Sequence, residues 1–135
     1  MADIYKAAGI LIKDKKLLVE KSFNKDFYIA PGGSIEDGET GEQALVRELE
    51  EEFGIHTKES DFEWFDEFSA RAAGNEDKAV HMKVWIVHDW QGEPAPNSEV
   101  ELIAWVTSAN QQGLKLGSIF EKDVIPKLKE MNLID

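Results

Sequence analysis

Four glutamates lie within five residues near the middle of the chain, and their spacing determines whether they can act together. Glu48, Glu51 and Glu52 are i, i+3 and i+4 neighbours, so a helix would place them in one sector, whereas Glu50 would point away. Like charges at this spacing destabilise a helix by a few tenths of a kcal/mol per pair. Hard divalent cations such as Mg²⁺ and Mn²⁺ prefer several oxygen ligands of this kind. The spacing therefore favours a metal-binding helix.

A turn-rich loop precedes these glutamates and bears on how they are interpreted. Taken alone, an acidic cluster is most often a solvated helix face. Gly32 and Gly33, however, allow close approach of the backbone and positive φ angles, and Asp37-Gly38 indicates a second turn. Such a loop can present carbonyls to a metal and amides to a phosphate. Loop and glutamates together predict a site for a metal ion and a phosphate group.

Local signals define the helix that would carry the glutamates, residues 41–53. Thr40 is placed to be the N-cap, Gln43 stands three residues later as its capping-box partner, and Gly54 follows where helices commonly end. At 100° per residue, the carboxylate sector adjoins an apolar stripe, which consists of Leu45, Val46, Leu49 and Phe53. We therefore expect the apolar stripe in the core and the carboxylates beside it.

The stretch from Gly33 to Ile55 resembles the Nudix box, G-x5-E-x7-R-E-U-x-E-E-x-G-U, in which U is aliphatic. Every defined position matches without insertion or deletion, namely Gly33, Glu39, Arg47, Glu48, Leu49, Glu51, Glu52, Gly54 and Ile55. The resemblance implies an α/β/α sandwich. It also implies hydrolysis of a phosphoanhydride bond in a nucleoside diphosphate linked to another moiety, with Mg²⁺ or Mn²⁺ as the cofactor.

The resemblance also implies a role for each residue. The metal ligands would be Glu51, Glu52 and the carbonyl of Gly32. Glu48 would be a further ligand or the base that activates water. Arg47 would orient the carboxylates through salt bridges, and Glu39 would help to fix the loop.

An additional carboxylate is expected from a segment after the box. Glu99 and Glu101 stand at alternate positions of a predicted strand, and we favour Glu99 because it is nearer the loop. Glu76 and Asp77 compete with them. An ordinary exposed carboxylate is the alternative interpretation for each of the four.

Candidate substrate contacts precede the helix. Lys21 could meet terminal phosphates, Phe27 and Tyr28 could stack on a base, and the backbone at Gly33 could approach a phosphate. The alternatives are a surface lysine and core aromatic side chains. Secondary signals typical of ADP-ribose, dinucleoside polyphosphate, NADH and coenzyme A hydrolases are absent. Elimination therefore favours a MutT-like pyrophosphohydrolase acting on a (d)NTP or an oxidised dNTP.

Other functions remain as alternatives. The protein could hydrolyse ADP-ribose or a dinucleoside polyphosphate with the same metal chemistry. It could be a non-catalytic nucleotide-sensing module, although such modules commonly lose box carboxylates and this chain has them all. Removal of a 5′ pyrophosphate from RNA would need a basic track for the strand, which a net charge of −12 disfavours.

Composition limits the partners and the location. The chain has 135 residues, which suits a single domain over 1–135. Its net charge of −12 predicts no binding to duplex nucleic acid or to anionic membranes, because both interactions depend on Lys and Arg. The chain has no cysteine, no apolar run approaching the roughly 20 residues of a membrane span, and no signal-peptide pattern. We therefore expect a cytoplasmic protein with a small-molecule nucleotide substrate, and a homodimer is possible.

The remaining elements must position this site. Alternation and turn signals predict strands over 4–12, 17–20, part of 26–33, 61–70, 79–90 and 98–107, with a polar loop over 71–78. A terminal helix is expected over 118–131. The pattern predicts an α/β fold with a mixed β-sheet packed between helices.

Overall fold

A computed structural model describes residues 3–72, 75–117 and 119–135, with the side chains of residues 70–77 left out of the description. The strands are β1 (Ile4–Ile10), β2 (Ile12–Lys13), β3 (Lys16–Ser22), β4 (Gly32–Ser34), β5 (Phe62–Ala72), β6 (Asn75–Val87) and β7 (Val100–Val106). The helices are α1 (Gly41–Phe53), a 3₁₀ turn (Glu59–Asp61), a π turn (Phe120–Val124) and α2 (Ile125–Glu130). In these segments no helix is both long and apolar enough to cross a membrane.

The strands form two sheets between the helices. The first has the order β4-β1-β6-β5 and is mixed, because β1 and β6 run parallel while the other neighbours are antiparallel. The second has the order β2-β3-β7 and is antiparallel. The predicted α/β fold with a mixed sheet is confirmed. The second sheet was not foreseen, because alternation within a strand does not reveal which strand it pairs with.

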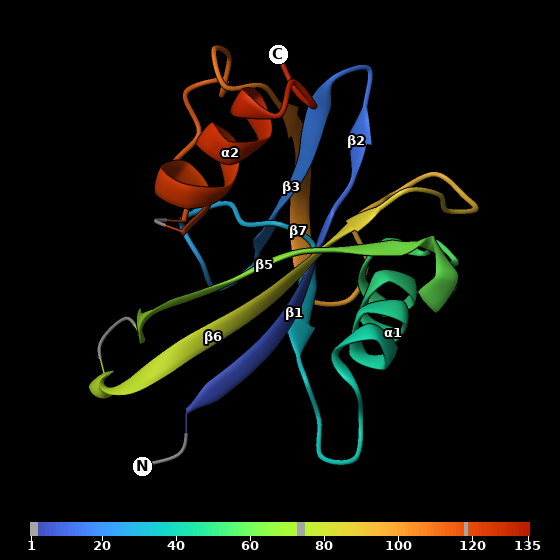
Figure 1. Cartoon of the computed structure of the whole chain (residues 1–135), viewed down its shortest axis with the longest axis vertical. Coiled ribbons are helices and arrows are strands. Elements are labelled where there is room, and N and C mark those ends of the chain that lie inside the picture. Colours follow the sequence, from blue (N-terminus) through green and yellow to red (C-terminus); the bar gives the residue numbers. More distant parts are fainter. Residues whose placement is uncertain (1–2, 73–74, 118) are drawn as a thin grey trace.

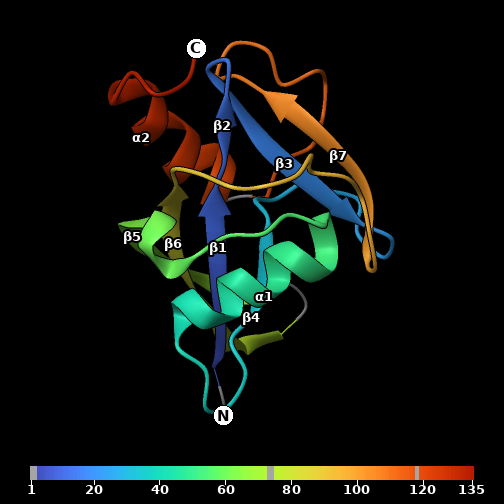
Figure 2. The same ribbon diagram turned by 90° about the vertical axis from the view of Figure 1, so that its right-hand side faces the viewer.

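Helices α1 and α2 lie on opposite sides of the strands (Figures 1 and 2). One hydrophobic cluster lies under each helix. Neighbouring residues divide between them because successive side chains of a strand point to opposite faces. In β3, for example, Leu17 and Val19 pack on the α2 side, whereas Leu18 packs on the α1 side. The arrangement is the α/β/α sandwich that the sequence predicts.

The predicted helix over 41–53 is confirmed with both of its caps. Thr40 accepts a hydrogen bond from the Gln43 amide, the Gln43 side chain accepts one from the Thr40 amide, and Gly54 adopts a left-handed φ of 70°. The buried face differs from the predicted stripe at three side chains, because Val46 is only half-buried whereas Ala44 and Glu48 are buried. The helix therefore turns a carboxylate, and not only its apolar stripe, toward the protein.

Three other elements differ from the predictions. The predicted loop over 71–78 is largely strand, because the antiparallel pairing of β5 and β6 continues to Ala72 and Asn75. In the range 26–33, Tyr28 and Ile29 form only isolated bridges, and the regular strand falls on the glycines of β4. The C-terminal helix begins with a π turn, in which the Ile125 amide donates to the Phe120 carbonyl. Pro126 follows directly and has no amide to donate, which favours this irregular winding.

Candidate active site

The glycine loop and α1 meet at a contact that only glycine permits. Gly32 and Gly33 lie in β4 and pair with Ala8 and Ala7 of β1. At Gly32, φ is 147° and a Cβ would lie 2.0 Å from the Ala7 carbonyl oxygen. At Gly33, a Cβ would lie 2.5 Å from the carboxyl carbon of Glu48. The Glu48 carboxylate therefore packs directly on the backbone of the loop.

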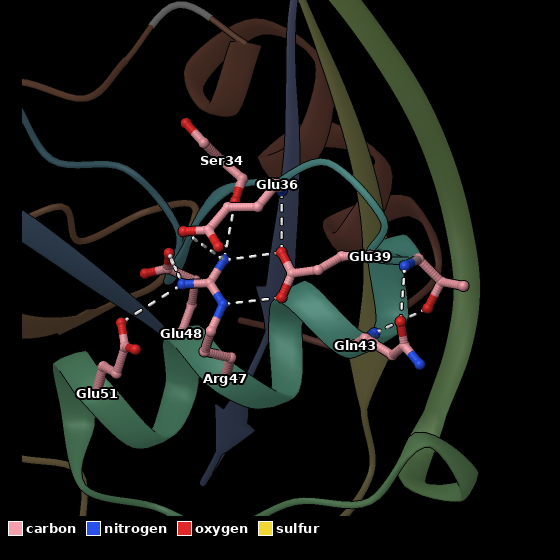
Figure 3. Close-up of polar contacts among 8 residues, drawn as sticks. Ser34, Glu36, Glu39, Gln43, Arg47, Glu48 and Glu51 are labelled. Atoms are coloured by element: carbon pink, nitrogen blue, oxygen red, sulfur yellow. Dashed lines mark hydrogen bonds and ion pairs between the residues drawn. The ribbon is translucent and has the colours of Figure 1, made fainter.

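Arg47 connects the loop to the acidic face of α1 (Figure 3). Its Nε and one terminal nitrogen donate to the two carboxylate oxygens of Glu39 at 2.8 and 2.9 Å, and the same terminal nitrogen donates to the Ser34 carbonyl at 3.1 Å. The other terminal nitrogen donates to Glu48 at 2.9 Å and to Glu51 at 3.4 Å. One guanidinium thus fixes the loop and two helix carboxylates relative to one another. These contacts are compatible with the orienting role that the resemblance implies for Arg47, and that role stays a prediction.

The Arg47–Glu39 pair is held in its charged form. Hydrogen bonds from Arg47, followed by one from the Glu36 amide at 2.9 Å, lower the pKa of Glu39 to about 2. The hydrogen bond to Glu39 in turn raises the pKa of Arg47. Bidentate guanidinium–carboxylate contacts are among the strongest charged hydrogen bonds in proteins. Glu39 thus joins the loop to Arg47, and its role in catalysis stays a prediction.

Glu48 and Glu52 of α1 have raised pKa values, in contrast to the lowered pKa of Glu39. Burial raises the pKa of Glu52 to about 8, with further contributions from the negative charges of Glu48, Glu20 and Glu99. Burial also raises the pKa of Glu48, although its contacts with Arg47 oppose the shift. Glu51 is largely exposed. The inner face of α1 therefore concentrates more negative charge than Arg47 can neutralise.

Glu20 of β3 belongs to this group, and the sequence analysis missed it. The residue is 2% exposed, and its Oε2 has no hydrogen-bond partner within the described part of the chain. Burial raises the pKa of Glu20 to about 7; Lys6 opposes the shift and the charges of Glu48 and Glu99 add to it. The available signal was the position of Glu20 at the end of the apolar run "LLVE", two residues after Leu18.

The two favoured downstream carboxylates occupy different surroundings. Glu99 precedes the first residue of β7, and its charge affects both Glu20 and Glu52. Glu101 lies in β7 and forms an ion pair with Lys21. The structure thus brings Glu99 to the acidic group and separates Glu101 from it. The backbone of Glu76 and Asp77 lies in β6, and their side chains lie outside the described part of the chain.

The residues predicted to contact the substrate lie in different surroundings. The Lys21 ammonium, besides its ion pair with Glu101, donates to the carbonyls of Ser22 and Lys25 at 3.3 and 3.1 Å. Phe27 is half-buried, whereas Tyr28 is buried in the cluster under α2. Contacts of Lys21, Phe27, Tyr28 and Gly33 with a substrate stay predictions.

Comparison with known proteins places the chain in a family. The family model described as the NUDIX domain matches residues 4–128. The chain belongs to the Nudix hydrolase family. Relatives include an 8-oxo-dGTP diphosphatase of Escherichia coli (strain K12), 44% identical over 64 residues, which are 47% of this chain and 46% of that protein. An 8-oxo-dGTP diphosphatase of Haemophilus influenzae is 36% identical over 93 residues, 65% of each chain. The matched stretches span between 31% and 65% of the curated relatives' lengths.

Solved structures with the same fold cover the whole Nudix domain. The solution structure of the E. coli ORF135 protein has a TM-score of 0.77 and 25% identity, with 100% of this chain and 96% of that chain covered. A MutT structure from a study of Aliivibrio salmonicida and Vibrio cholerae has a TM-score of 0.74 and 25% identity, covering 96% and 99% of the two chains. The Nudix membership and fold implied by the sequence are confirmed.

Nudix hydrolases generally use divalent metal ions, and the acidic face of α1 fits such an ion. In the described part of the chain, no three Asp, Glu or His side chains are grouped closely enough to enclose an ion in this conformation. The donor set is nevertheless the one that Mg²⁺ and Mn²⁺ prefer, since it consists of carboxylate oxygens. The fit rests on this set of oxygen donors and on the buried Oε2 of Glu20, which has no hydrogen-bond partner among the described residues.

Proposed function

We propose that the protein is a divalent-metal-dependent pyrophosphohydrolase that converts a nucleoside triphosphate, a (d)NTP or an oxidised dNTP, to the monophosphate and pyrophosphate. The observation that carries the proposal is the carboxylate face of α1, which Arg47 orients against a glycine loop. In this reaction a water oxygen bonds to one of the two phosphorus atoms of the α–β phosphoanhydride. The bond from that phosphorus to the bridging oxygen breaks, the bridging oxygen leaves with the other product, and a carboxylate takes the proton of the water.

The metal ligands proposed from this chain are Glu48, Glu51, Glu52 and the Gly32 carbonyl, with Glu99 close to the same group. A divalent cation held by these residues would neutralise phosphate oxygens, lower the pKa of a water molecule and reduce the repulsion between an anionic substrate and a protein with a net charge of −12.

The chain's own residues supply orientation and proton transfer. Arg47 and Glu39 hold the loop, so that its backbone stays at a fixed distance from α1. Glu48, which packs on Gly33, is the proposed base or a further ligand. A carboxylate with a raised pKa is suited to accept a proton near neutral pH. Most of the rate in phosphoryl transfer comes from such positioning and charge stabilisation.

The relatives support a triphosphate substrate and identify its main competitor. Three curated relatives carry the name 8-oxo-dGTP diphosphatase. A fourth is an ADP-ribose pyrophosphatase of Methanocaldococcus jannaschii, 47% identical over 53 residues. ADP-ribose is therefore the alternative substrate to be tested beside the triphosphates.

The substrate experiment measures phosphate, pyrophosphate and nucleoside monophosphate released from a panel with Mg²⁺ or Mn²⁺. The panel contains dNTPs, 8-oxo-dGTP, ADP-ribose, dinucleoside polyphosphates and NADH. Pyrophosphate release from one triphosphate class is the expected result. Faster turnover of ADP-ribose or a dinucleotide would retain the metal chemistry and refute the proposed substrate. Tight metal-dependent binding without turnover would instead favour a nucleotide sensor.

Gly33→Ala tests the contact between loop and helix. Alanine fits the backbone here, because Gly33 lies outside the positive-φ region, but its Cβ would overlap the Glu48 carboxylate. We expect kcat/KM for pyrophosphate release to fall by about 10- to 100-fold, as for losses of support around a metal ligand. The control is Gly113→Ala, where φ is 72° and nothing lies within 4 Å of the added Cβ. That variant should lose stability and retain kcat/KM. Wild-type activity in Gly33→Ala would show that the close packing of Glu48 on Gly33 is not needed for the reaction.

The stability of the metal-free protein should depend on pH. Glu20 and Glu52 have pKa values raised from 4.5 to about 7 and about 8, so the folded state keeps protons that the unfolded chain has lost. The free energy of unfolding should therefore fall as pH rises from about 4.5 to about 8. Mg²⁺ should raise the melting temperature more near pH 8 than near pH 4.5. Urea denaturation and melting curves measure both effects, and a level or rising metal-free stability would contradict the raised pKa values.

A further inference from the structure

Glu20 is a buried acid outside the Nudix box, and one of its carboxyl oxygens lacks a hydrogen-bond partner among the described residues. Its amide donates to the Ile29 carbonyl at 2.7 Å and its carbonyl accepts from the Ile29 amide at 2.9 Å, while β7 pairs with it on the other side at Ile103. These contacts fix the backbone between two strands. The residue is 2% exposed, and its Oε2 has no hydrogen-bond partner among the residues that the structure describes. Burying such a group without a partner is costly, and structures therefore usually pair it.

The direction of the Glu20 side chain follows from the alternation of β3. Leu17 and Val19 pack in the cluster under α2, and Leu18 packs in the cluster under α1. Glu20 stands two residues after Leu18, so it projects from the same face, toward α1. The charges felt by its carboxyl agree with this direction, because those of Glu48 and Glu99 raise its pKa. Glu20 in turn acts on Glu52.

We propose that Glu20 contributes a carboxylate oxygen to the divalent cation that Glu48 and Glu52 hold. The inference rests on the proposed metal-dependent function. Two of these acidic side chains come from α1 and one from β3. In this conformation they are not grouped closely enough to enclose an ion, so binding would draw their carboxyl groups together. A cation supplies the missing partner for the buried Oε2 and compensates three negative charges at once.

A purely structural role for Glu20 makes a different prediction. Glu20 would stay protonated, and its replacement would leave metal binding unchanged. Among the groups that act on Glu20, Lys6 would be the one whose charge stabilises its ionised form. Lys6 lines a small cavity beside Gly32 and Gly33, and it leaves Oε2 without a hydrogen bond. Metal affinity therefore separates the two roles without any measurement of activity.

The test is a titration with Mn²⁺, in which electron paramagnetic resonance reports the free ion, on the wild type and four variants. Glu20→Gln should weaken Mn²⁺ binding by about 10- to 100-fold. Its melting temperature without metal should equal or exceed that of the wild type, because a buried charge is removed. Glu52→Gln should also weaken binding. Glu63→Gln is the control, since Glu63 is an exposed residue paired with His88, and it should bind like the wild type.

The outcomes separate the inference from the proposed function. Absence of Mn²⁺ binding by the wild type would overturn the proposed function itself. Wild-type affinity in Glu20→Gln, together with weakened binding in Glu52→Gln, would overturn only the role of Glu20. Glu20→Asp keeps the charge and shortens the side chain, so a ligating oxygen predicts weakened binding there as well. Wild-type affinity in Glu20→Asp but not in Glu20→Gln would mean that Glu20 acts only through its charge, and the ligand assignment would be wrong.

Discussion

Glu52→Gln is expected to reduce kcat/KM for pyrophosphate release by about 10³-fold, because it removes a charged oxygen ligand of the proposed cation. Glu52 is the box carboxylate best suited to this role. Arg47 engages Glu48 and Glu51, whereas burial and three neighbouring negative charges raise the pKa of Glu52 to about 8. The same substitution should raise the melting temperature of the metal-free protein, since it removes part of this repulsion. Steady-state kinetics over a range of Mg²⁺ concentrations and thermal melting measure the two effects.

Glu50→Gln is the matched control for Glu52→Gln. Glu50 lies on the same helix, is exposed, and stands 3.8 Å from His56 at the far side of α1. The substitution changes the net charge by the same amount and leaves the inner face intact. We expect kcat/KM within about twofold of the wild type, as for substitutions at exposed sites. Equal losses in the two variants would mean that net charge, and not ligation, controls the activity.

Arg47→Lys is expected to lower both Mn²⁺ affinity and kcat/KM by about 10- to 100-fold, although the positive charge remains. A lysine cannot reproduce the two-pronged contact with Glu39 while also donating to the Ser34 carbonyl and to Glu48. The loop would then no longer be held in a fixed position relative to α1. Manganese titration and steady-state kinetics measure the losses.

A double-mutant cycle shows whether Arg47 acts through Glu39. Glu39→Gln removes the other half of the bidentate pair, in which the pKa of Glu39 is lowered to about 2. Because both changes disrupt one contact, the loss in Arg47→Lys/Glu39→Gln should be much smaller than the sum of the single losses on a free-energy scale. Additive losses would show that the two residues act independently.

The sequence predicts α1 and its caps correctly because the signals are local. Thr40, Gln43 and Gly54 act within one or two turns of the helix, and the structure confirms all three. The Arg47–Glu39 contact is also short-range, since it joins one helix to the loop directly before it. These parts depend on few contacts from distant segments, so local signals predict the helix and its caps, while the roles of Arg47 and Glu39 came from the resemblance to the Nudix box.

The parts that the sequence could not predict depend on strand pairing. Glu20 reaches the acidic group only because the second sheet places β3 opposite α1. Lys21 and Glu101 form an ion pair because β3 and β7 are neighbours near a register shift at Lys21 and Ser22. A shift of one residue would exchange the two faces of the strand, and no local pattern determines it.

A crystal grown with saturating Mn²⁺ tests the central claim, that α1 holds the catalytic cation through its carboxylates. The anomalous signal of manganese locates the ion without reference to the expected chemistry. The structure predicts a peak on the inner face of α1, bound by Glu52 and Glu48, with Glu20 oriented toward it. A manganese ion bound elsewhere, with this face empty under conditions in which the protein releases pyrophosphate, would contradict the assignment.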